Sequence, residues 1–89
     1  MNDFLHITYP AANYIIKSTD QYIGATASGI TLTLPAGING RFYQIKNQST
    51  GNITVQGTGG QTIEGAVTKI LNTNAGITVV FDGTVWKIL

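Results

Sequence analysis

The chain has 89 residues, enough for one domain and too few for two. Ile, Val and Thr fill 30 positions while Glu occurs once, so the composition favours strands over helices. Cysteine is absent, which excludes a disulfide framework or a thiolate metal site. Charged residues are 10% of the chain and the net charge is +1, which argues against electrostatic binding to nucleic acid or an anionic membrane.

The first 16 residues combine large apolar side chains with no strand or helix period. These side chains are Phe4, Leu5, Ile7, Tyr9 and Tyr14. They are too many for a solvated tail, so we expect residues 1–16 to be an arm that docks on a neighbouring chain or on another partner protein. The alternative is that the arm covers a sheet edge of its own domain. The first residues resemble no secretory signal, so we expect the chain to be made and kept in a cytosol.

Residues 17–89 are expected to form a single β domain, because polar and glycine-containing turns separate short alternating segments. In residues 30–34, for example, Ile30, Leu32 and Leu34 share one face. An Asn-Gly pair at residues 39–40 and an Asp-Gly pair at 82–83 predict tight hairpins, the second of type I′. The fold class predicted is all-β, with short antiparallel strands in a small sandwich or barrel and no helix. The strands are expected at residues 14–16, 22–23, 30–34, 41–47, 53–56, 61–64, 67–71, 77–81 and 85–89.

A short pattern recurs three times along the chain. Gly or Asn followed by Ile-Thr and an aliphatic residue occurs at residues 29–32, 52–55 and 76–79, in steps of about 23 residues. Such residues are also common at strand entries, so the pattern is compatible with a true internal repeat or with independent strand starts.

The titratable residues do not predict an enzyme. His6 is the single histidine, and no glycine elbow surrounds any serine. Asp20 and Asp82 are explained by turns, although sequence spacing does not forbid a carboxylate pair that includes Glu64. We therefore expect no catalytic residue, no metal site and no cofactor.

The last strand is apolar on both faces. Trp86 and Ile88 share one face, while Val85 and Leu89 share the other. This is more apolar surface than one small sandwich needs to bury, so these four residues are expected in the core of an oligomer, which we predict to be a homotrimer. A dimer would satisfy the burial argument equally well. An exposed Trp86 would instead favour stacking on a sugar.

Five segments, taken in order, resemble small β-domains in virion proteins of tailed bacteriophages, which include head decoration or cement proteins, head fibres and tail-fibre tips. The segments are ITLTLP at residues 30–35, GRFYQIKN at 40–47, GNITV at 51–55, IEG at 63–65 and FDGTVW at 81–86. The resemblance implies a structural role without catalytic residues, commonly as a homotrimer on the virion surface.

Within that class, the shortness of the chain favours a capsid decoration or cement protein that binds the outside of a phage head and stabilises it. Its partners would be further copies of itself and the major capsid protein, on which the arm at residues 1–16 would dock. It would be located on the capsid surface, after assembly in the host cytoplasm. The alternative function is a tail-fibre or head-fibre tip domain that binds host-surface glycans. A free-standing sugar-binding module is a third hypothesis, which requires exposed aromatic side chains.

Overall fold

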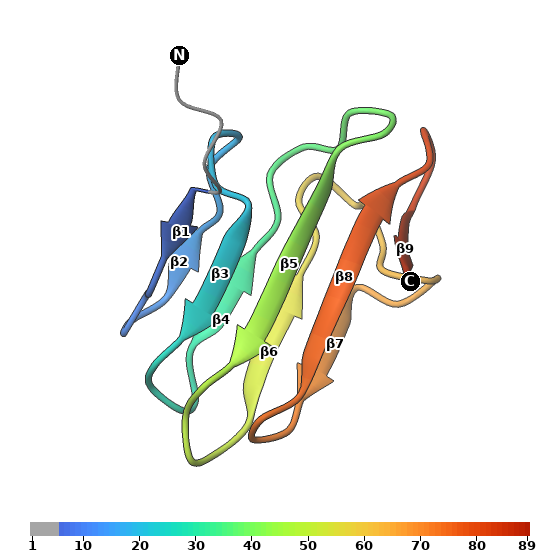
Figure 1. Ribbon diagram of the computed structural model, residues 1–89. Helices are drawn as coiled ribbons and strands as arrows, with labels where there is room; N and C mark the ends of the chain where they lie inside the picture. Colours follow the sequence, from blue (N-terminus) through green and yellow to red (C-terminus); the bar gives the residue numbers. More distant parts are fainter. Residues whose placement is uncertain (1–5) are drawn as a thin grey trace.

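The computed structural model describes residues 6–89, which form two facing β-sheets (Figure 1). The five-stranded sheet has the order β1 (Ile7–Thr8), β3 (Tyr22–Ala25), β5 (Phe42–Asn47), β8 (Gly76–Phe81) and β9 (Trp86–Ile88). The four-stranded sheet has the order β2 (Tyr14–Ile15), β4 (Thr31–Thr33), β6 (Ile53–Gln56) and β7 (Thr68–Leu71). The described residues contain no helix, and the predicted all-β sandwich is confirmed.

The first six strands alternate between the two sheets, which corrects the expected strand pairing. Only the pairs β5–β8, β6–β7 and β8–β9 are antiparallel. The pairs β1–β3, β3–β5, β2–β4 and β4–β6 are parallel. Parallel neighbours need a long crossover connection, and here a strand of the opposite sheet lies within each crossover. The chain thus winds around the core before its last three strands turn back.

Two local expectations are not met in the structure. The Asn-Gly pair at residues 39–40 does not close a hairpin, because β4 and β5 lie in different sheets. Gly40 has a positive φ of 87°, and its N–H donates to the carbonyl of Phe81 at 2.8 Å, which holds this loop against the end of β8. Residues 61–64 are not a strand either. In that segment Ile63 forms isolated bridges with Ala66 and Trp86.

The 23-residue pattern has a structural counterpart in two of its three copies. Thr31 of β4 pairs with Thr54 of β6, and Leu32 pairs with Val55, so equivalent positions lie side by side in the four-stranded sheet. The third copy lies in β8 of the other sheet. The 23-residue spacing is therefore the length of chain that leaves β4, passes through β5 of the other sheet and returns to β6.

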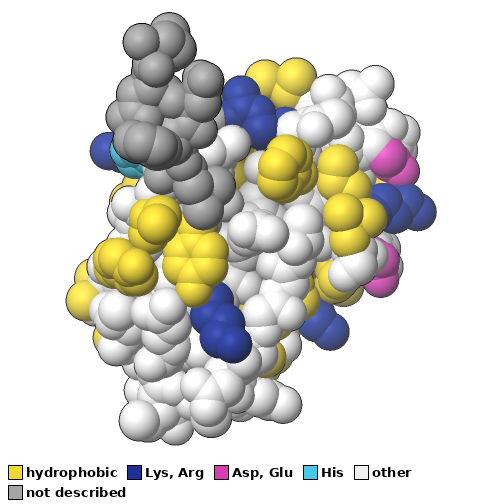
Figure 2. All heavy atoms as spheres, in the orientation of Figure 1, with side chains coloured by type: hydrophobic (Ala, Val, Ile, Leu, Met, Phe, Trp, Pro, Cys, Tyr) yellow, Lys and Arg dark blue, Asp and Glu magenta, His cyan; other side chains and the backbone are white. Residues whose placement is uncertain are grey.

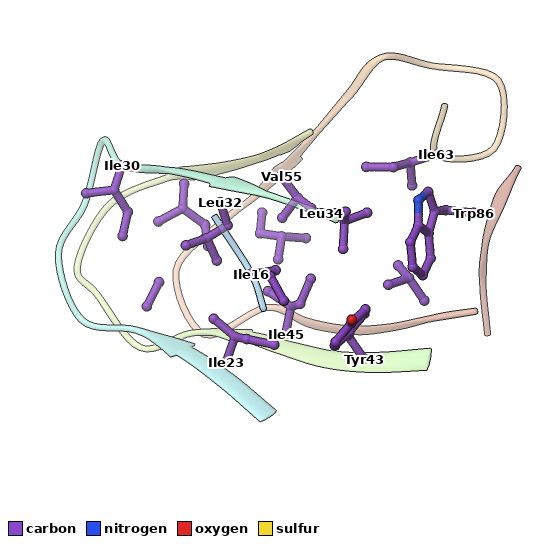
Figure 3. Packing of buried hydrophobic residues seen from close by; sticks show 14 of the residues in the cluster. Ile16, Ile23, Ile30, Leu32, Leu34, Tyr43, Ile45, Val55, Ile63 and Trp86 are labelled. Carbon is purple, nitrogen blue, oxygen red and sulfur yellow. The ribbon is translucent and has the colours of Figure 1, made fainter. Parts of the chain in front are cut away.

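The hydrophobic core fills the space between the two sheets (Figure 3). Ile30 lies at one end of it, and Trp86 lies at the other end beside Ile63. The alternation along the strands produces this layer, because every second side chain points inward. In β5, for example, Tyr43 and Ile45 are buried while Phe42 and Gln44 are exposed.

A buried asparagine links the sheets at the end of the sandwich away from Trp86. The Asn47 amide nitrogen donates to the carbonyl oxygens of Gly51 at 2.7 Å and Leu71 at 2.9 Å. Its side-chain oxygen accepts from the backbone N–H and hydroxyl of Ser49, at 2.9 and 2.6 Å. Asn47 is fully buried, and these four bonds satisfy its side chain, which stabilises the polar turns around it.

The final hairpin is present where the sequence predicts it, but its loop is longer than a type I′ turn. Phe81 pairs with Trp86, so residues 82–85 form a four-residue connection. The Asp82 carboxylate accepts the N–H groups of Val85 and Thr84, each at 2.9 Å. The hydrogen bond from Val85 above all, and then that from Thr84, hold the pKa of Asp82 below its ordinary value.

This pKa shift predicts an acid-sensitive hairpin. Because the folded-state pKa of Asp82 is lower than its unfolded value, the stabilisation is present above about pH 4 and is lost as pH falls through the folded-state pKa. The variant Asp82→Asn keeps an oxygen that accepts both N–H groups without titrating. Its melting temperature should therefore fall less than that of the wild type between about pH 5 and about pH 2.5. Parallel melting profiles for the two proteins would contradict this account of the hairpin.

Candidate functional site

The predicted oligomer-core residues of the last strand lie in different environments. Trp86 has 0% of its surface exposed and packs within one chain against Phe81 and Tyr43, with ring centroids 5.2 and 5.8 Å away. It is therefore inaccessible both to a neighbouring chain and to a sugar. Val85 and Ile88 are half-buried, while Leu89 is 80% exposed. Of the four residues, Leu89 offers by far the most surface to a partner.

The described part of the N-terminal segment lies on the domain itself. Ile7 belongs to β1 and Tyr14 to β2, so residues 6–16 add one edge strand to each sheet, and Ile16 is buried in the core. Ile7 and Tyr9 nevertheless remain exposed, while Tyr14 is half-buried against the core. Phe4 and Leu5 lie outside the described residues. Docking of this segment on another chain stays a prediction.

A buried carboxylate fastens this segment to the turn before β3. Asp20 is 1% exposed. It accepts the Tyr14 hydroxyl at 2.7 Å and the Lys17 N–H at 2.9 Å on Oδ2, and its Oδ1 lies 3.2 Å from His6 Nδ1. Burial raises the pKa of Tyr14, and the hydrogen bond to Asp20 raises it further. Sequence reasoning assigned Asp20 to a polar turn and missed these long-range partners.

The carboxylates of the described residues are occupied in structural hydrogen bonds. Glu64 accepts the Ile88 N–H at 3.0 Å, and Asp82 and Asp20 are held as described above. The contact between His6 and Asp20 resembles half of a hydrolytic triad, but among residues 6–89 no hydrogen bond joins His6 to a serine. That part of the chain also contains no cluster of three potential metal ligands and no helix that could cross a membrane.

The outer face of the five-stranded sheet is partly apolar, and Lys46 of β5 and Lys87 of β9 lie on it. Cross-strand pairing aligns Ile7, Tyr22, Gln44 and Thr78 in one row, and Leu89 continues that row through its N–H bond to the Thr78 carbonyl at 2.8 Å. Figure 2 shows hydrophobic side chains gathered at both sides of this face, with mostly uncharged surface between them and Lys or Arg side chains beside them. A shallow hollow of about 310 Å³ lies beside Tyr22, Gln44 and Leu89.

A larger cleft of about 470 Å³ opens at one end of the same sheet. Two loops form it, the turn before β3 and the connection from β4 into β5. Its apolar walls are Ile38 and Phe42, which are 61% and 45% exposed. Its polar lining residues are Ser18, Thr19, Asp20, Gln21, Asn39, Gly40 and Arg41.

Arg41 is held in place within this cleft. One guanidinium nitrogen, Nη1, donates to the carbonyl of Ser18 in the opposite loop and to the Tyr43 hydroxyl at 3.3 Å. The guanidinium carbon also lies 6.0 Å from the centre of the Tyr43 ring, within the range of a cation–π contact. The sequence places Arg41 at a strand start, but it gives no sign that the loop at residues 17–21 faces it.

These features define a two-sheet β-sandwich domain with partly apolar outer faces and a cleft at one end that Arg41 lines. Residues 11–87 match the family described as the phage depolymerase C-terminal beta sandwich domain. The chain therefore belongs to this family, and the resemblance to small β-rich phage virion domains is confirmed. Comparison with curated proteins and with solved structures finds no match. The family match gives no support to capsid decoration and favours the tail-fibre alternative.

Proposed function

We propose that this protein is the terminal, non-catalytic β-sandwich of a tail-fibre-type phage protein and that it binds glycans on the host surface. The family match over residues 11–87 carries the proposal, because it relates the chain to the C-terminal domains of phage depolymerases. The engagement of Asp20, Glu64 and Asp82 in structural hydrogen bonds supports a recognition role rather than a catalytic one.

The surface chemistry of the sheets suits an oligosaccharide. The outer face of the four-stranded sheet aligns Thr33 with Gln56 and Thr68, and Thr31 with Thr54. Hydroxyl and amide groups such as these exchange hydrogen bonds with sugar hydroxyls without the desolvation cost of a charge. On the other sheet, the half-buried ring of Tyr22 supplies an apolar surface against which a pyranose ring packs.

Cell binding tests this function. A fluorescent fusion of the 89-residue chain should label bacteria that carry their surface polysaccharide and should not label isogenic cells that lack it. The assay uses a panel of encapsulated strains with matched polysaccharide-deficient mutants. Equal labelling of both members of every pair, or no labelling of any strain, would refute the proposal.

We also propose that the domain assembles as a homotrimer through the β9 edge of the five-stranded sheet, which leaves Phe42 and Tyr22 accessible. Leu89 is 80% exposed at this edge, Val85 and Ile88 are half-buried, and a chain of this size buries a limited fraction of its surface alone. Light scattering should give three times the 9.5 kDa chain mass at micromolar concentration. The variant Leu89→Asp should lower that mass, because it places a charge in an apolar contact. A wild-type mass of one chain would refute the trimer.

A further inference from the structure

We infer that the cleft around Arg41 binds an anionic sugar unit, such as a uronic acid or a sugar phosphate, within a host polysaccharide. This inference rests on the proposed glycan-binding function and adds a place and a charge to it. The cleft volume of about 470 Å³ lies within the usual range for ligand sites, which is about 300–1,000 Å³. Its walls combine polar groups with two exposed apolar side chains, as a sugar site requires.

The orientation of Arg41 makes it suited to an anion. The bonds from Nη1 to the Ser18 carbonyl and the Tyr43 hydroxyl fix the plane of the guanidinium group. Arginine carries five N–H donors, and the described residues supply no acceptor for those on Nε and Nη2. A planar group with free parallel donors binds a carboxylate or phosphate through two hydrogen bonds, with little further loss of side-chain entropy.

The acidic groups of the described residues near the cleft do not neutralise Arg41. Asp20 lines the cleft, yet it is buried and takes its hydrogen bonds from Tyr14, Lys17 and His6. Asp82 lies on the neighbouring loop, where its Oδ1 accepts two backbone N–H groups. Neither carboxylate is hydrogen-bonded to the guanidinium. Among the described residues, therefore, no carboxylate neutralises the positive charge that a ligand entering the cleft would meet.

The remaining lining residues favour a sugar over a simple ion. Phe42 is exposed at the start of β5, next to Arg41, and its ring offers a flat face for the C–H groups of a pyranose. Ile38 contributes a second apolar wall. The side chains of Asn39 and Gln21 supply amide donors and acceptors for hydroxyl groups. A sugar whose anionic group binds Arg41 and whose ring packs against Phe42 would use the charged and the apolar surface of the cleft at once.

An array of purified bacterial polysaccharides of known composition tests the inference. The wild-type chain should bind one or more polysaccharides that contain uronic acid or phosphate. Reduction of the uronic acid carboxyl groups should abolish binding to the first kind, and removal of phosphate with hydrofluoric acid should abolish binding to the second. The treatment that abolishes binding identifies the anionic group. Binding should also weaken with added salt, because an ion pair at a partly exposed site is screened.

Two variants and one matched control locate the binding. Arg41→Gln should weaken binding about tenfold or more, as expected for the loss of a charge-assisted pair. Phe42→Ala removes an exposed ring and should also weaken it. Lys69→Gln removes the same charge from an exposed position in β7 of the other sheet and should leave binding unchanged. If Arg41→Gln does not fold, as judged by its thermal melting, Phe42→Ala decides the outcome.

The possible results separate this inference from the proposed function. Undiminished binding by both Arg41→Gln and Phe42→Ala would overturn the site while leaving glycan binding intact. An equal loss in Arg41→Gln and Lys69→Gln would show general charge attraction, which also overturns the site. Binding that resists both carboxyl reduction and phosphate removal would overturn the anionic ligand. A wild-type chain that binds no polysaccharide would refute both proposals.

Discussion

Replacing Trp86 with Ala should lower the free energy of unfolding by about 3–5 kcal/mol, the usual cost of deleting a large buried aromatic side chain. The indole is fully buried between Phe81 and Tyr43 at one end of the core, so truncation leaves a cavity that the two-sheet framework cannot close. Native domains are stable by only about 5–15 kcal/mol. Urea titration at a fixed protein concentration should therefore show a strongly destabilised or unfolded variant.

Two further variants separate packing from other effects at this position. Trp86→Phe should cost less than Trp86→Ala, because it keeps a ring and removes a buried indole N–H that has no hydrogen-bond partner among the described residues. Lys87→Ala changes the exposed neighbour in β9 and should have little effect. If Trp86→Ala and Lys87→Ala unfold at the same urea concentration, the core described above is wrong.

Replacing Asp20 with Ala should destabilise the domain by about 3 kcal/mol, since hydrogen bonds to a charged group contribute about 1.5–3 kcal/mol each and the loss is only partly additive. The change leaves the Tyr14 hydroxyl and the Lys17 N–H without their acceptor. It also removes the contact with His6 at the start of the described chain. Hydrogen exchange should then accelerate in β1 and β2 more than in β5 and β8.

Single-partner variants provide the controls for Asp20. Tyr14→Phe removes one of the three partners and should cost about 1 kcal/mol. His6→Ala should cost less, because the His6 side chain is 61% exposed and its contact is open to water. An Asp20→Ala variant as stable as His6→Ala would contradict the fastening of the N-terminal segment by this carboxylate.

Local sequence signals predict most of the strands, although the strand expected at residues 61–64 is not one of them. Alternation in residues 30–34 and 41–47 predicts β4 and β5 closely, because burial on one face imposes a two-residue period. The Asp-Gly pair at residues 82–83 likewise predicts the last hairpin. The two-residue β1 is missed, since Ile7 and Thr8 are too few to show a period.

The pairing of the strands could not be predicted from turn chemistry. An Asn-Gly pair permits a positive φ, and that conformation serves a sheet-to-sheet connection as readily as a hairpin, as Gly40 illustrates. The better signal was the 23-residue spacing, which aligns Thr31 with Thr54 in parallel strands. The spacing between the first two copies of the pattern thus indicates which strands are neighbours. A turn motif indicates only the conformation of the local backbone.

The candidate site depends on contacts that a sequence does not display. Arg41 and Ser18 are separated by 23 residues and meet because β3 and β5 are parallel neighbours. The same winding brings Asp20 to Tyr14 and His6. By contrast, the burial of Trp86 follows from its size and its place in an alternating strand, and it excludes the sugar-stacking alternative considered for this residue.

The central claim is that the domain recognises glycans without cleaving them. The most direct test is to incubate the domain with a polysaccharide that it binds. Equilibrium binding and the size distribution of the same polysaccharide would be measured after prolonged incubation with the purified 89-residue chain. The account predicts saturable binding with an unchanged chain-length distribution. A shortened polysaccharide, or the absence of saturable binding to every polysaccharide tested, would contradict it.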